Sequence, residues 1–186
     1  MTIEEIFSKI SAHSIRGMMI HDGMANYYDF LGLHGFKRCH EYHYLHETLL
    51  NRKINRFFIN KYNKLIPDSE VDSSSVIPAA WMRYTRHQVD NSTKRNAVES
   101  GFDAWVKWER DTCEFYSNMC IEFENMGEIA AAELLRDLIL DNNKEIKKAE
   151  RMQLKLKATD YDMTYIVECQ DRLHEKYKDK TEKIKL

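Results

Sequence analysis

The chain has 186 residues, of which 43% are hydrophobic and 31% charged, and its formal net charge is -2. These values indicate one globular domain, and they exclude a strong overall field that would draw the chain to nucleic acid or a membrane surface. No apolar run reaches the ~18–20 residues of a membrane helix, and the first residues lack the features of a signal peptide, so we expect a cytoplasmic protein with no membrane partner.

Glycine and proline are scarce, with six and two residues in the whole chain. Sheet proteins need a turn every ~8–12 residues and place glycine and proline there. Long helices need few turns. The composition therefore predicts an all-α fold.

The first half of the chain shows two long helical patterns. Apolar residues recur at spacings of three and four over residues 3–31, which predicts an α-helix. Gly32 and Gly35 are expected in the turn that follows. A second helix is predicted over residues 36–65, and Pro67 ends it.

The second half begins with a segment of different composition, residues 66–92, in which serine, proline and acidic residues alternate with apolar ones. So many apolar groups are unusual in a free tether, so we expect a crossover packed against the helices. Further helices are predicted over residues 93–125 and 128–157, followed by a C-terminal helix within 158–186. The prediction is an antiparallel four-helix bundle, residues 1–157, with a long crossover between its second and third helices and an additional C-terminal helix.

Polar residues stand at positions that the apolar stripes predict to be buried. They are His21, Asp22, His43, His46, Glu47, Glu109, Asn142 and Glu145. Ionisable groups avoid protein cores unless they are paired or bind a metal. Counted from turns near His34 and Gly127, the pair His21/Asp22 should lie level with His46/Glu47, and Glu109 level with Glu145. The remaining histidines are expected at the surface or its boundary: His13, His34, His40, His87 and His174.

In this architecture the chain resembles the ferritin-like superfamily over about residues 3–157. The family pattern implies one carboxylate from each of two helices and a Glu-x-x-His from each of the other two. Asp22, Glu47 and Glu109 match three of the carboxylates. Both histidines are missing, because Leu50 follows Glu47 at the first position and lysines (Lys144, Lys148) stand near the second.

The resemblance implies a metal centre with an incomplete ligand set. His43 and His46 could supply substitute imidazoles, and mixed His/carboxylate ligation suits iron, manganese or zinc. The predicted metal ligands are Asp22, His43, His46, Glu47, Glu109 and Glu145. The predicted function is metal binding, iron binding or oxidation, in a homo-oligomer, and the sequence does not decide whether the protein is an enzyme.

Two alternatives to a metal protein remain open. In the first, the protein is a non-enzymatic helical scaffold without a metal, in which the polar residues satisfy one another and Lys144 or Lys148 neutralises the carboxylates. In the second, a basic stretch over residues 52–64 binds nucleic acid. We do not expect this partner, because acidic residues around the turn near Gly127 should lie beside that stretch.

Overall fold

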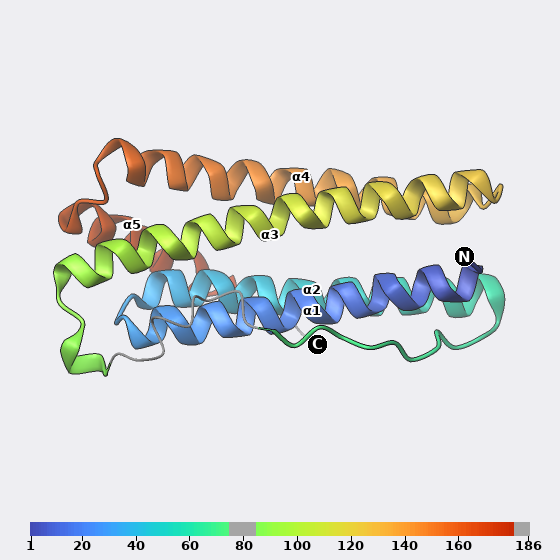
Figure 1. Cartoon of the computed structure of the whole chain (residues 1–186), viewed down its shortest axis with the longest axis horizontal. Helices are drawn as coiled ribbons and strands as arrows, with labels where there is room; N and C mark the ends of the chain where they lie inside the picture. The colour runs from blue at the N-terminus through green and yellow to red at the C-terminus, as the bar shows by residue number, and fades with distance from the viewer. Residues whose placement is uncertain (75–84, 181–186) are drawn as a thin grey trace.

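The apolar stripes form helices in the computed structural model, which describes residues 1–74 and 85–180. The α-helices in these ranges are α1 (Ile3–Phe30), α2 (His34–Tyr62), α3 (Asn91–Asn125), α4 (Ile129–Ala158) and α5 (Met163–Tyr177). This order confirms the predicted all-α bundle with a long crossover between α2 and α3 and an additional C-terminal helix (Figure 1). Part of the predicted crossover, residues 75–84, lies outside the described residues.

Local chemistry explains where the helices begin and end. Thr2 caps α1 by accepting a hydrogen bond from the Glu5 backbone N–H, and Glu5 accepts one from the Thr2 N–H in return. Asp90 caps α3 through the N–H of Thr93, which starts that helix two residues earlier than predicted. Gly32 and Gly127 have φ values of 71° and 74°, which explains why glycine follows α1 and α3.

The helices form two antiparallel hairpins that lie side by side, α1 with α2 and α3 with α4 (Figure 1). The described part of the crossover runs back along the α1/α2 hairpin after α2 ends (Figure 1). Helix α5 packs on α2, near the start of α3 and the end of α4. None of the helices in the described ranges is long and apolar enough to cross a membrane.

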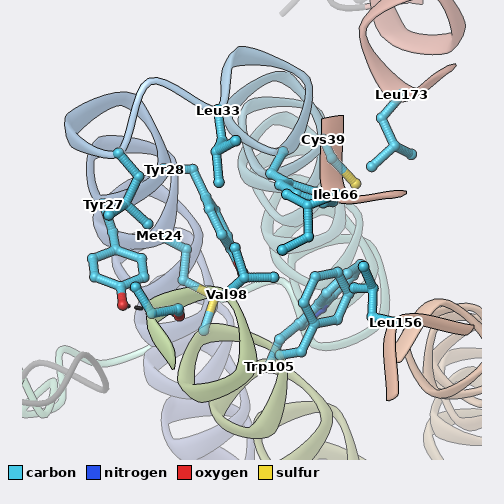
Figure 2. Close-up of a cluster of buried hydrophobic side chains, with 14 of the residues drawn as sticks. Met24, Tyr27, Tyr28, Leu33, Cys39, Val98, Trp105, Leu156, Ile166 and Leu173 are labelled. Atoms are coloured by element: carbon cyan, nitrogen blue, oxygen red, sulfur yellow. Dashed lines mark hydrogen bonds between the residues drawn. The ribbon is translucent and has the colours of Figure 1, made fainter. Parts of the chain in front are cut away.

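Buried side chains form two hydrophobic clusters, one toward each end of the bundle. The first contains Tyr28, Trp105 and Ile166, and Figure 2 shows how α5 contributes Ile166 and Leu173 to it. The second contains Phe7 and Phe58 with further residues from α3 and α4. Truncating one such aromatic residue to alanine typically costs ~3–5 kcal/mol, so these clusters stabilise the two ends. Polar residues separate them.

Candidate metal centre

A polar belt crosses the bundle between the two hydrophobic clusters. We define it as Ser14, His21, His40, His43, Glu47, Glu109, Thr112, Asn142, Glu145 and Lys148. On α3, for example, Glu109 lies between Trp105 of the first cluster and Tyr116 of the second. Burying ionisable groups is costly unless hydrogen bonds or opposite charges compensate. The hydrogen bonds and ion pairs of each belt residue therefore show how far the cost of its burial is compensated.

Glu109 is the most deeply buried carboxylate of the belt, with a relative exposure of 5%. Its Oε1 accepts a hydrogen bond from Trp105 Nε1 at 2.8 Å, and its Oε2 accepts one from Asn142 Nδ2 at 2.7 Å. Burial raises the pKa of Glu109 to about 7, although the hydrogen bond from Trp105 favours the charged form. The side chain is therefore held in place while its charge is only partly compensated.

Glu47 lies beside Gly17 of α1. A Cβ atom at Gly17 would lie 3.1 Å from Glu47 Cδ, so the glycine makes room for the carboxyl group. The Ser14 hydroxyl lies 3.4 Å from Glu47 Oε2. Burial, together with the nearby Glu109 charge, raises the pKa of Glu47 to about 8. Both glutamates would thus lose their protons more readily if a cation lay between them.

A cavity of about 200 Å³ opens beside these two glutamates. Its polar lining is His43, His46, Glu47, Lys53, Glu109, Thr112, Tyr116, Asp141, Asn142 and Glu145. Asn142 Oδ1 is buried and has no hydrogen-bond partner within the described ranges. Since buried polar atoms are nearly always paired, this oxygen is free to accept a bond from water or to coordinate a cation.

Three histidines stack behind the carboxylates. The Nδ1 atoms of His21 and His40 are 3.1 Å apart, so one ring donates and the other accepts. His21 Nε2 lies 3.7 Å from Glu109 Oε1. Burial lowers the pKa of His21 to about 3 and holds the pKa values of His40 and His43 well below their ordinary value. All three imidazoles are therefore neutral at neutral pH and can accept hydrogen bonds.

Lys148 of α4 reaches the polar belt from the side that α5 covers. Its Nζ donates to His43 Nε2 at 2.9 Å and to Glu145 Oε2 at 3.0 Å. The Tyr177 ring of α5 lies 5.2 Å from Nζ. Burial opposes the charge of Lys148, but Cys39 and Glu145 outweigh it, and the pKa of the ammonium lies above its ordinary value. Glu145 thus has a cation of its own.

The structure brings five of the six predicted ligands to one cavity: His43, His46, Glu47, Glu109 and Glu145. Asp22 is not among them, because its side chain is exposed and accepts a hydrogen bond from Asn26. The turn between α1 and α2 is centred near Gly32 and not near His34, so Gly17 stands beside Glu47. Across residues 1–74 and 85–180, no three His, Cys, Asp or Glu side chains are arranged to hold a metal ion together.

Some belt residues were missed or undervalued at the level of sequence. The prediction that His40 lies at the surface is wrong, because its relative exposure is 1%. The spacing His40-x-x-His43 could have shown it, since residues three apart share a helix face. Asn142 stood on a predicted stripe but was not among the predicted ligands, and its contact with Glu109 needs the pairing of α3 with α4.

Comparisons with known proteins establish the class of fold. No protein-family model matches the chain, and no curated protein matches it. Among solved structures, an open-pore ferritin from Archaeoglobus fulgidus matches with a TM-score of 0.76 and 15% identity over 91% of this chain and 94% of that chain. A humanized archaeal ferritin matches with a TM-score of 0.72 and 16% identity, covering 91% of this chain and 93% of that one.

A PmFTN variant soaked in iron has the same fold, with a TM-score of 0.70 and 12% identity over 90% of this chain and 95% of that chain. The chain therefore has a ferritin-like fold, and the resemblance predicted from the sequence is confirmed at the level of the fold.

Proposed function

We propose that the protein binds one divalent transition-metal ion, iron(II) in the first place or manganese(II), in the cavity of the polar belt. The ligands are the carboxylates of Glu47 and Glu109 and the amide oxygen of Asn142. The observation that carries the proposal is the free Asn142 Oδ1 at a cavity that two buried carboxyl groups also line. Oxygen donors of this kind suit hard or borderline divalent cations.

Charge compensation supports the same conclusion. Within the described ranges, no lysine or arginine forms an ion pair with Glu47 or Glu109. Their raised pKa values, about 8 and about 7, show what it costs to keep both charges in the belt without a cation. A divalent ion would neutralise both groups, and its binding would release the protons they carry.

The donor set fits one ion, with the cavity supplying the rest of its coordination. A water molecule occupies ~30 Å³ of liquid, so a cavity of about 200 Å³ has room for an ion and several waters. The ferritin-like fold adds support, since one of the similar structures, a PmFTN variant, was soaked in iron. The homo-oligomer, the cytoplasmic location and an oxidation reaction stay predictions.

A binding titration with a matched control tests the proposal. Glu109→Gln removes one ligand charge, while Glu114→Gln makes the same change at an exposed position of α3. We expect one Mn(II) per chain by calorimetry, more than about 100-fold weaker binding in Glu109→Gln, and unchanged binding in Glu114→Gln. Absence of binding by the unaltered chain, or equal affinity in Glu109→Gln, would contradict the proposal.

The non-enzymatic scaffold is the second candidate, and the contacts of Lys148 favour it. This ammonium already satisfies His43 and Glu145 without a metal. If the rest of the belt is equally self-contained, Glu109→Gln will change the stability of the bundle but no binding property. The same titration therefore separates the two functions.

A further inference from the structure

We propose that Lys148 occupies the place of a second cation in the polar belt and so restricts the metal centre to one ion. This inference rests on the proposed function, because it concerns His43 and Glu145, which line the same cavity as Glu47 and Glu109. It assigns His43 and Glu145, both predicted as ligands, to the lysine and not to the metal.

The two atoms that hold the ammonium have the geometry of a ligand pair. His43 Nε2 and Glu145 Oε2 are 3.5 Å apart. Two donors at ~2.1 Å from one ion and at a tetrahedral angle are ~3.4 Å apart. The pair is thus spaced as if for one cation, and Lys148 Nζ lies within 3.0 Å of both atoms.

The ammonium is fixed in this place from several sides. The side chains of Lys148 and Glu145 retain relative exposures of 21% and 27%, while that of His43 retains 4%. The Tyr177 ring of α5 faces Nζ at 5.2 Å, a favourable cation–π distance. An ammonium and a divalent ion repel each other strongly at such distances, so the two cannot share the His43/Glu145 pair.

The same cavity connects this pair to Glu109. Its lining includes Glu47, Glu109 and Glu145. Asn142 is hydrogen-bonded to Glu109, and Lys148 is hydrogen-bonded to Glu145. The belt therefore has two neighbouring cation positions, one of them filled by the chain itself.

Removing the ammonium should open the second position. Lys148→Ala frees His43 Nε2 and Glu145 Oε2, whereas Lys147→Ala removes the same charge from an exposed position of α4 and serves as the control. We expect one Mn(II) or Fe(II) per chain in the unaltered protein and in Lys147→Ala, and two in Lys148→Ala. The double variant Lys148→Ala/His43→Leu should return to one.

Metal analysis after equilibrium dialysis measures these numbers, and circular dichroism establishes that each variant is folded. If Lys148→Ala does not fold, Lys148→Gln removes the charge, is one atom shorter and keeps a polar side chain at this half-buried position, and it should also bind two ions. One ion in both the unaltered chain and the folded lysine variant, or two in the unaltered chain, would overturn the inference. No ion in the unaltered chain but one in Lys148→Ala would refute the proposed function and support the inference, while none in either would refute both.

Discussion

The polar belt has two parts, a lysine half (His43, Glu145 and Lys148) and a cavity half (Glu47, Glu109 and Asn142). They differ in how the charge of a buried carboxylate is compensated. In the lysine half, Glu145 pairs with Lys148, and α5 covers the pair through Tyr177. In the cavity half, Glu47 and Glu109 line the cavity, which Glu145 also lines, and they have raised pKa values and no ion pair with a lysine or arginine within the described ranges. The difference teaches that the chain compensates the charge in one half itself, while the other half is where we propose that a cation from solution binds.

After the carboxylates themselves, the largest effect should follow from removing the Asn142 amide, which is hydrogen-bonded to Glu109. Asn142→Leu deletes the donor to Glu109 Oε2 and the free Oδ1 in one change. Loss of a group that orients a ligand typically weakens metal binding ~10–100-fold, and because Asn142 is also a proposed ligand, we expect a decrease in Mn(II) affinity of at least that order. Asn143, the next residue of α4, contacts Cys113 instead. Asn143→Leu should therefore leave the affinity unchanged. Equal affinities in the two variants would remove the distinction between the halves.

Helix α5 covers the lysine half, and a substitution at Gly35 of α2 should weaken its packing. A Cβ atom there would lie 1.7 Å from the backbone oxygen of Gln170, so Gly35→Ala must push α5 away from α2. Overpacking of this kind costs ~1–3 kcal/mol or more, and denaturation with hydrogen exchange should show lower stability and faster exchange in α5.

Gly23→Ala of α1 is the matched control for Gly35→Ala. A Cβ at Gly23 meets nothing within 4 Å, so this change should stabilise α1 by ~0.5–1 kcal/mol. Metal affinity should stay the same in both variants, because α5 covers only the lysine half. A loss of Mn(II) binding in Gly35→Ala would show that the two halves are not independent.

The last effect concerns the metal-free protein and is a pH dependence of its stability. Burial and the Glu109 charge raise the pKa of Glu47 from 4.5 to about 8, so the folded chain binds a proton that the unfolded chain releases in this range. Stability contributed by this group is present below pH 4.5 and is lost as the pH rises toward 8. The stability of Glu47→Gln relative to the unaltered chain should therefore increase as the pH rises from 4.5 to 8, by up to about 1.4 kcal/mol per pH unit.

Urea denaturation without metal measures this difference at each pH. His21 acts in the opposite direction, since its folded pKa of about 3 lies below 6.5 and its contribution is lost as the pH falls from 6.5. Comparing the variant with the unaltered chain cancels that shared contribution. A stability difference independent of pH would show that the pKa of Glu47 is not raised in the folded chain.

The sequence predicted the helices better than it predicted the belt. Helix periodicity depends on local spacing, and all five helices were found within a few residues, while residues 181–186 of the predicted C-terminal segment lie outside the described residues. Contacts across helices depend on where a turn is centred, and a shift from His34 to Gly32 was enough to exchange Asp22 for Gly17 beside Glu47. That Lys148 could neutralise a carboxylate was one alternative read from the sequence, but its contacts with His43 and Tyr177 could not be predicted, because these residues come from α2 and α5.

The central claim is that the cavity half of the belt takes a metal ion from solution. Anomalous X-ray scattering from crystals grown with Mn(II) tests it most directly, because each ion gives a peak whose neighbours can be identified. We predict one peak per chain, next to Glu47, Glu109 and Asn142 Oδ1, and none between His43 and Glu145. A belt without any peak, or a peak in the place of the Lys148 ammonium, would contradict the claim.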